Sequence, residues 1–232
     1  MDLLVIDVGG SNVKLRVSGE PDPRSFESGE LTPEELVARV RSATADWHFD
    51  VISLGYPGLV NDGLPAAEPG NLGPGWVGFD FKQAFRKPVR LVNDAVLQAL
   101  GAYEGGRMLF LGLGTGLGSA LVTEHVVVPL ELGNLASGKD GTLAQRVGRK
   151  GLENSGIETW IEDVYEMVTV LRSALVAEYV VLGGGNAELV EPLPKLTRRG
   201  GNEDAFTGGY RLWEEVVEPH DREPHRVWRV VR

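Results

Sequence analysis

The chain has 232 residues, no cysteine and a formal net charge of −10. Without cysteine it can hold no disulfide, no thiolate nucleophile and no Cys-ligated zinc. The acidic balance argues against a general nucleic-acid partner, because phosphate backbones need basic surface, although local N–H dipoles can still bind a phosphate group. No apolar run approaches the ~20 residues that span a bilayer, and no signal-like segment precedes the first predicted strand. We therefore expect a soluble, cytoplasmic globular protein.

The first half of the chain predicts one helix among short strands. Thr32 is a suitable N-cap, Pro33 takes the first helical position and Glu35 completes a capping box, so a helix is expected to begin there. Residues 56–87 are rich in Gly and Pro and predict a long irregular excursion, and such loops are usually functional. Aliphatic and β-branched runs predict strands at 3–6, 13–17, 51–54 and 89–92.

The second half predicts a similar unit with longer helices. A helix is expected over 94–103, capped by Asn93 or Asp94, and a last amphipathic helix over 205–217. In the Arg- and His-rich tail, 227–231 can add an edge strand. The other predicted elements are strands at 108–111, 119–122, 126–128 and 179–182 and a long helix over 156–178.

Two glycine turns stand in equivalent places in the two halves. They are the segments DVGGSNVK at 7–14 and GLGTGLG at 112–118, each between two extended runs. Glycine lets the backbone approach an anion closely, so the tip of such a hairpin can cradle phosphate. A single hairpin of this kind is more often an ordinary tight turn. Two of them indicate related halves that face each other across a nucleotide cleft.

Polar residues beside these turns are candidates for chemistry, and each also has a plain structural reading. Asp7 ends the first strand and can hold Mg²⁺ or cap its own turn. Asp94 follows a strand and can accept a proton from a hydroxyl, or it can cap a helix with Asn93. Asn71 and Trp76 suit a polyhydroxy ligand, and they are also common turn and anchor residues.

Other polar and glycine-rich segments give weaker signals. The cluster 183–185 can lie against a base and ribose, or it can be only a tight turn. The four histidines show no metal spacing and receive no role. A basic group can form a groove for polyphosphate, but a charged, solvated helix face explains it better: Lys139, Arg146, Arg149 and Lys150.

The order of these motifs resembles the ROK sugar-kinase family over about residues 1–215, and within it most resembles the bacterial polyphosphate glucokinase branch. The resemblance rests on the two glycine turns, Asn71 with Trp76, the Asn93-Asp94-Ala95 segment, Glu131-Leu132-Gly133 and the 183–185 cluster. It implies an α/β fold with two RNase H-like lobes of the actin/hexokinase ATPase type, with mixed sheets flanked by helices and a cleft between them. Residues 1–93 would form the small lobe and 94–232 the large lobe, the last helix packing back on the small one.

Site residues follow from the same resemblance. Asp94 would be the general base on the sugar 6-hydroxyl, and Asp7 would act at Mg²⁺. Four residues would bind sugar hydroxyls: Asn71, Asn93, Glu131 and Asn134. The phosphate donor would lie against Gly9, Gly10, Ser11, Asn12, Lys14, Gly114, Thr115 and Gly116, with Gly184 beside the nucleotide.

The implied function is transfer of a phosphoryl group from ATP or polyphosphate to a hexose, glucose O6 being the first candidate. The alternative is a non-catalytic sugar- or nucleotide-binding protein derived from such a kinase. Asn134 stands where the family usually has a His after Glu-x-Gly, which bears on sugar specificity. The family's structural zinc is not expected here, and neither is a nucleic-acid or membrane partner; a homodimer is.

Overall fold

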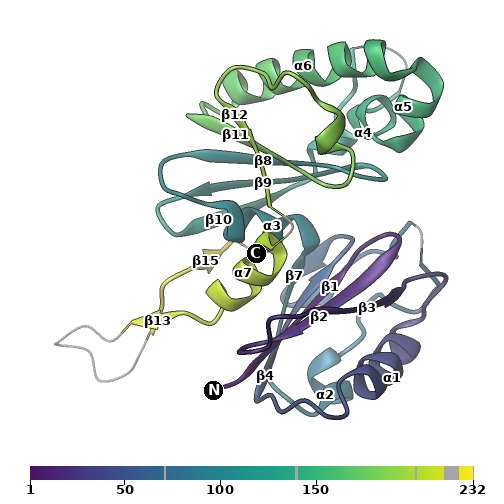
Figure 1. The fold of residues 1–232 in the computed structure, drawn as a ribbon, viewed down its shortest axis with the longest axis vertical. Helices are drawn as coiled ribbons and strands as arrows, with labels where there is room; N and C mark the ends of the chain where they lie inside the picture. The colour runs from purple at the N-terminus through teal and green to yellow at the C-terminus, as the bar shows by residue number, and fades with distance from the viewer. Residues whose placement is uncertain (71, 139–140, 202, 217–224, 232) are drawn as a thin grey trace.

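The computed structural model describes residues 1–70, 72–138, 141–201, 203–216 and 225–231. Two β-sheets lie one above the other in Figure 1, each covered by helices on its outer face. Two further helices lie between the sheets, α3 (Asp94–Ala102) and α7 (Asp204–Arg211). No helix in the described part of the chain is long and apolar enough to cross a membrane.

The first sheet contains the N-terminal glycine turn. Its strand order is β3-β2-β1-β4-β7; β1, β2 and β3 pair antiparallel, and β4 and β7 continue the sheet in parallel from β1. The strands predicted at 3–6, 13–17, 51–54 and 89–92 are all present, whereas β3 was not predicted. Their bounds are β1 (Leu3–Val8), β2 (Asn12–Val17), β3 (Arg24–Glu27), β4 (Val51–Tyr56) and β7 (Val89–Asn93).

The second sheet has the order β12-β11-β8-β9-β10-β15 and contains the second glycine turn, between β8 and β9. Helix α6 (Ile157–Ala174) covers its outer face with the shorter α4 (Leu143–Val147) and α5 (Arg149–Ser155). The strands are β8 (Met108–Leu113), β9 (Leu117–Thr123), β10 (Val126–Leu130), β11 (Tyr179–Gly183), β12 (Thr197–Arg199) and β15 (Arg229–Val230).

Helix α1 (Pro33–Ala43) begins as predicted. The Thr32 side chain accepts from the Glu35 backbone N–H, and the Glu35 carboxylate accepts from the Thr32 N–H, which completes the capping box. The four apolar residues Pro33, Leu36, Val37 and Val40 are buried against the first sheet. This confirms a prediction that needed only local sequence, because a capping box satisfies its own backbone donors.

The excursion at 56–87 is more ordered than predicted. It contains a small hairpin of β5 (Val60–Asn61) and β6 (Leu64–Pro65), and the helix α2 (Phe81–Phe85) capped by Asp80. Trp76 is fully buried, packs on Tyr56 and donates its indole N–H to the Leu31 carbonyl. Of the two readings for Trp76, the structure supports the anchor; the indole is not available to a sugar.

The C-terminal region also departs from the prediction. Helix α7 ends at Arg211 instead of continuing to 217, and two short strands follow, β13 (Glu215–Val216) and β14 (His225–Arg226). The edge strand expected at 227–231 is present as β15, which pairs in parallel with β10. Trp228 is buried beside it, with its ring against Tyr103 and His125.

The two central helices cross at close range. A Cβ added at Gly208 would lie 1.8 Å from the Leu97 carbonyl oxygen, and one at Gly101 would lie 1.9 Å from the Asp204 carbonyl oxygen. Only glycine permits this approach at either position. Because α7 also contacts β1 and β4, and α3 contacts β8, β9, β10 and β11, the pair of helices connects the two sheets. The domain boundary at 93/94 itself stays a prediction.

Candidate active site

The first glycine turn is the tip of the β1–β2 hairpin, and it is held from one side. Asp7 pairs with Lys14 across the hairpin, and the Gly9 N–H donates to the Asn12 carbonyl at 3.0 Å. Ser28 fixes the tip from β3, because its hydroxyl donates to the Gly9 carbonyl at 2.7 Å. The tip is exposed while Asp7 is half-buried at its base.

The second glycine turn lies at the end of the β8–β9 hairpin and packs against the turn that follows β11. Gly114 N–H donates to the Gly116 carbonyl, and Arg149 N–H donates to the Gly114 carbonyl at 3.0 Å. Gly184 has φ +79, and a Cβ there would lie 2.5 Å from the Leu113 carbonyl oxygen. Gly184 is therefore required for packing at this crossing, whatever it does for a ligand.

Asp94 is the first residue of α3 and projects from the end of β7. Its Oδ1 accepts from the Ala95 backbone N–H at 2.8 Å, and Asn93 Oδ1 accepts from the same N–H at 2.9 Å. The Asn93 amide nitrogen donates to the Gly58 carbonyl at 3.0 Å. Asn93 thus acts as the N-cap of α3 and ties it to the loop after β4.

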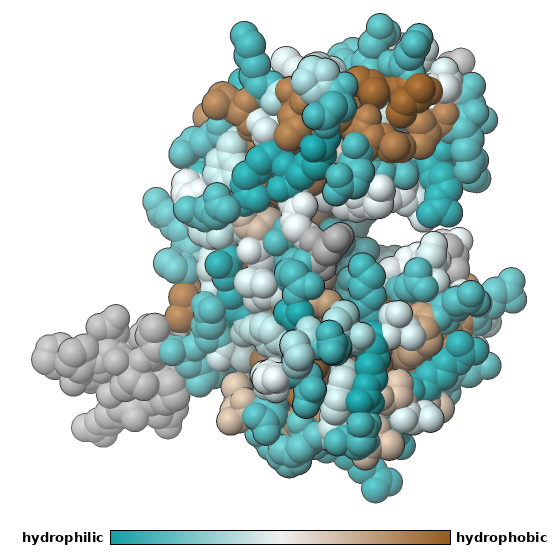
Figure 2. Space-filling model, in the orientation of Figure 1, coloured by the Kyte–Doolittle hydropathy of each residue, from teal (hydrophilic) through white to brown (hydrophobic). Residues whose placement is uncertain are grey.

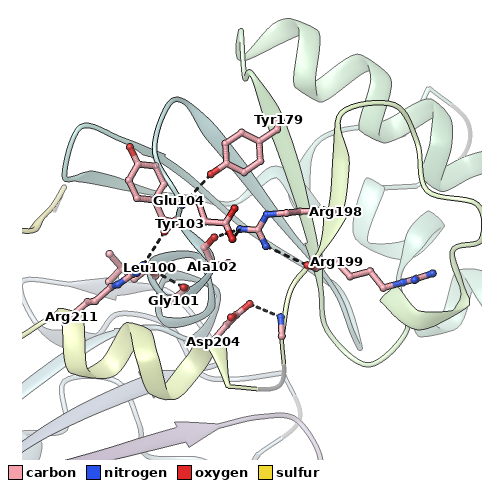
Figure 3. A network of polar contacts seen from close by, with 11 residues as sticks. Leu100, Gly101, Ala102, Tyr103, Glu104, Tyr179, Arg198, Arg199, Asp204 and Arg211 are labelled. Atoms are coloured by element: carbon pink, nitrogen blue, oxygen red, sulfur yellow. Dashed lines mark hydrogen bonds and ion pairs between the residues drawn. The ribbon is translucent and has the colours of Figure 1, made fainter.

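The opposite end of α3 is fixed by two arginines (Figure 3). Arg211 donates to the carbonyls of Leu100, Gly101 and Tyr103, and Arg198 donates to the carbonyl of Ala102. These carbonyls end a helix and have no partner within it, and cations at a helix C-terminus are electrostatically favourable. Helix α3 is therefore held at both ends, which fixes the position of Asp94.

A cleft of about 710 Å³ lies between the two hairpin tips and the start of α3. It opens on one side of the molecule between the two sheets, as the space-filling view shows (Figure 2). Asp7, Asp94 and Glu131 all line it. Lys14 and Arg149 are positively charged side chains in the same lining.

Burial changes the protonation of the acids in this cleft. The pKa of Asp94 is raised to about 7, mainly by desolvation and also by the negative charges of Asp7 and Glu131, against two backbone hydrogen bonds that lower it. Desolvation raises the pKa of Asp7 to about 6, against the nearby Lys14, which lowers it. Desolvation also raises the pKa of Glu131. Two aspartates repel each other in one cleft, and this arrangement suits a divalent cation or a proton held between them.

The segment that carries Glu131 is fixed to the second sheet and to α6. Ser119 accepts from the Leu132 N–H, at the start of the 3-10 turn η1 (Leu132–Asn134). Arg146 donates to the Ser137 carbonyl and forms ion pairs with Asp163 and Glu166. The Arg146 side chain is only 8% exposed. It is therefore not available to a polyphosphate chain, and it is not part of a solvated helix face either, which was the interpretation that the sequence favoured.

Comparison with known proteins gives relatives in sequence and in fold. No family model matches the chain. It is 26% identical to a polyphosphate glucokinase of Mycobacterium leprae over 208 residues, 78% of this chain and 62% of that protein. The inorganic polyphosphate/ATP-glucomannokinase from Arthrobacter sp. strain KM has the same fold, with a TM-score of 0.77 at 22% identity over 90% of this chain and 96% of that one. A ROK family glucokinase from Streptomyces griseus, solved with glucose and AMPPNP, has a TM-score of 0.69 at 16% identity, over 90% of this chain and 98% of that one.

In sequence the chain is similar to the polyphosphate glucokinases, and its fold is that of solved ROK-family proteins. The predicted fold class is thereby confirmed. The chain spans 62% of the length of the M. leprae relative.

The ROK fold brings most of the predicted site residues to the one cleft. Asn134 lies on η1, three residues from Glu131, and is exposed and absent from the lining. Asn71 lies outside the described residues, as does Lys139 of the basic group. The predicted residues in the lining are Asp7, Gly9, Gly10, Ser11, Asn12, Lys14, Asn93, Asp94, Gly114, Thr115, Gly116, Glu131 and Gly184.

Some residues that line the cleft were not predicted from the sequence. Gln98 follows Asp94 by one helical turn, and a helical period could have suggested it. Asp204 enters the cleft from α7, far along the chain, so no local pattern could place it there.

His48, which received no role, lies with Asp2 and Asp50 in an exposed group whose ligand atoms are within 4.8 Å of one another.

Proposed function

We propose that this protein is a hexose kinase that transfers a phosphoryl group from ATP or polyphosphate to a sugar hydroxyl, glucose O6 being the first candidate. The observation that carries the proposal is the shared cleft of Asp94, Asp7 and Glu131 between two glycine hairpins. Phosphoryl transfer depends mainly on positioning and charge neutralisation, and this cleft supplies groups for both. The names of the sequence relative and the structural neighbours support the same chemistry.

The donor would lie between the two hairpin tips. The N–H groups of Gly9 and Gly114 donate within their own turns and shape them. The glycines of both tips allow the backbone to approach phosphate oxygens closely. Lys14 on the first hairpin and Arg149 at the start of α5, next to the second hairpin, add positive charge, and both can contact the phosphates of a nucleotide or a polyphosphate chain.

The chemistry of the acids fits Mg²⁺, which prefers carboxylate oxygens and substrate phosphates. Asp7 would hold the ion, with Asp94 close enough for its charge to be felt. Bound there, Mg²⁺ would neutralise charge on the transferred group. Lys14 lowers the pKa of Asp7, so its charge favours the ionised carboxylate that a cation needs.

On the acceptor side, Asp94 would remove the proton from the attacking hydroxyl. One of its oxygens accepts from the Ala95 N–H, which leaves the other for the sugar. A pKa of about 7 is suited to this task, because a general base works best near the operating pH. Glu131 and Asn93 would bind other hydroxyls; for Asn71 and Asn134 this role stays a prediction from the resemblance. A homodimer and a cytoplasmic location also stay predictions.

The test is a coupled kinase assay over a panel of hexoses with ATP and with polyphosphate. Asp94→Asn should lower kcat by about 10²–10⁴-fold, because the hydroxyl loses its proton acceptor. Asp22→Asn changes an exposed aspartate outside the cleft in the same way and should leave kcat unchanged. If no hexose is phosphorylated with either donor while calorimetry detects sugar binding, the protein is a sugar-binding relative and the kinase proposal is wrong.

A further inference from the structure

A second pocket, of about 440 Å³, adjoins the catalytic cleft. Two residues line both spaces, Asn93 and Glu131. Asp7 and Asp94 line only the cleft. The pocket therefore begins where the proposed sugar-binding groups are, on the side away from the two aspartates.

The pocket lies between the outer strands of the two sheets. β7 is the last strand of the first sheet and β15 the last strand of the second, and both contribute to the lining. The β15 side is a firm wall, because Arg229 N–H donates to the His125 carbonyl at 2.7 Å and Val231 N–H to the Val127 carbonyl at 2.8 Å. Trp228 also lines the pocket, and its indole N–H donates to the Glu214 carboxylate at 2.9 Å.

The lining favours an apolar ligand over an anion. Aliphatic side chains come from every wall, and they include Leu59, Val92, Leu212 and Val230. The guanidinium of Arg90 donates to the Leu212 carbonyl, lies 3.8 Å from the centre of the Trp213 ring and forms an ion pair with Glu215, which balances its charge. Lys82 and Arg229 are offset by Asp62 and Glu131 in the same lining, so the pocket offers no excess positive charge to a phosphate.

We propose that this pocket receives an apolar substituent on the acceptor sugar, so that the protein takes alkyl or aryl glycosides as well as free hexoses. The proposal rests on the proposed kinase function and extends its substrate class. A sugar held by Asn93 and Glu131 with its reacting hydroxyl at Asp94 directs the opposite side of its ring to the pocket. For reaction at O6, that side includes C1, where an aglycone is attached.

The experiment compares free glucose with methyl, phenyl and octyl glucosides of both anomers, the octyl glucosides below their micelle concentration. Burial of a phenyl group should lower KM about ten-fold relative to the methyl glucoside of the same anomer. Val231→Trp fills the mouth of the pocket from a side chain that is 41% exposed, and it should remove this advantage. The matched control Val170→Trp, on the outer face of α6, should keep it.

The outcomes separate this inference from the kinase proposal. If glucose is phosphorylated but phenyl and octyl glucosides do no better than methyl glucoside, the pocket inference is wrong and the kinase proposal stands. If disaccharides are better substrates than the apolar glycosides, the pocket binds polar substituents and the proposed class of apolar ligands is wrong. If no sugar is phosphorylated, calorimetry with octyl glucoside decides: binding weakened by Val231→Trp supports the pocket alone, and no binding overturns it.

Discussion

The two cleft aspartates differ in what their neighbours do to their charge. Lys14 partly compensates Asp7, whereas Asp94 faces the negative charges of Asp7 and Glu131 in addition to its own desolvation. The pKa of Asp94 is accordingly the higher of the two, about 7 against about 6. Both roles need the ionised carboxylate: the lower pKa of Asp7 keeps it the more fully ionised of the two at neutral pH, as a cation ligand requires, and the pKa of Asp94 lies near the operating pH, as proton transfer requires.

The pH profile of kcat/KM should show this base. Asp94 must be ionised to take a proton, and its pKa is raised, so the active form accumulates as pH rises through about 7. We expect kcat/KM for the hexose to level off above about pH 8 and to fall about ten-fold per pH unit well below 7. Initial rates from pH 5.5 to 9 at saturating donor measure this, with the coupling enzymes in excess. A flat profile would contradict the assignment of Asp94.

Asp7 should lower the free energy of unfolding at neutral pH. Its pKa is about 6 in the fold and near 3.8 when unfolded, so the folded state binds the proton more tightly. Stability contributed by this group is therefore present at low pH and is lost as pH rises from about 4 to about 6. Asp7→Asn should leave stability near wild type at pH 4 and raise it by about 1–3 kcal/mol at pH 8, measured by urea unfolding.

The effect of Mg²⁺ on thermal stability tests the role of Asp7 in a second, independent way. An ion that binds only the folded state stabilises it, so Mg²⁺ should raise the Tm of the wild type. Asp7→Asn should remove most of that increase, and the exposed control Asp22→Asn should keep it. An equal Mg²⁺ effect in Asp7→Asn would mean that the ion binds elsewhere.

At the scale of elements, the crossing of α3 and α7 determines where Asp94 lies. Arg211 and Arg198 bind the carbonyls at the end of α3, and glycines allow α7 to pack directly on its backbone. Asn93 and Asp94 bind the first free N–H of α3. The helix cannot shift along its axis without breaking contacts at both ends.

Gly208→Ala should disturb this crossing. The added Cβ would lie 1.8 Å from the Leu97 carbonyl oxygen, a backbone atom that cannot move aside alone. We expect a loss of about 1–3 kcal/mol in urea unfolding, and more if α7 is displaced. Gly70→Ala is the matched control, because its Cβ would meet nothing within 4 Å and its φ is not positive. Equal stability of the two variants would show that the helices can separate at little cost.

In the molecule as a whole, α7 and the residues on either side of it are attached to the first sheet by polar contacts. The Ser53 hydroxyl on β4 donates to the Gly209 carbonyl at 2.6 Å and accepts from the Trp213 indole N–H at 3.0 Å. Arg16 on β2 pairs with Glu203, next to the start of α7, and packs on the Phe206 ring. The first sheet is thus attached to the second partly through an element from the far end of the chain.

Ser53→Ala should weaken this attachment. The change leaves the Gly209 carbonyl and the Trp213 indole N–H without their partner in a buried place, which costs about 1–3 kcal/mol. Urea unfolding measures the loss, and tryptophan fluorescence should report a changed environment at Trp213. Ser173→Ala, on the exposed face of α6, is the control and should be near neutral. A loss no larger than the control would mean that water replaces the hydroxyl.

Elements with local causes could be predicted from the sequence, and elements with distant causes could not. The capping box at Thr32 and the strands that flank both glycine turns depend on neighbours in the chain, and all are present. The short helices α4 and α5 and the end of α7 at Arg211 were missed or misplaced, because packing on other elements sets their bounds. For Trp76 the sequence left two interpretations open, a ligand contact or an anchor, and the fold decides for the anchor in the core.

The two glycine hairpins and the acids beside them can be found from the amino-acid sequence alone, because backbone freedom and strand-end position are local properties. Only the tertiary structure decided that both hairpins, Asp94 and Glu131 share one cleft, since they meet through contacts between distant segments. It also decided that Arg146 is buried in ion pairs, and that the tail forms a pocket wall beside Asn93. Such outcomes depend on which surfaces exclude water together, and a linear pattern does not specify that.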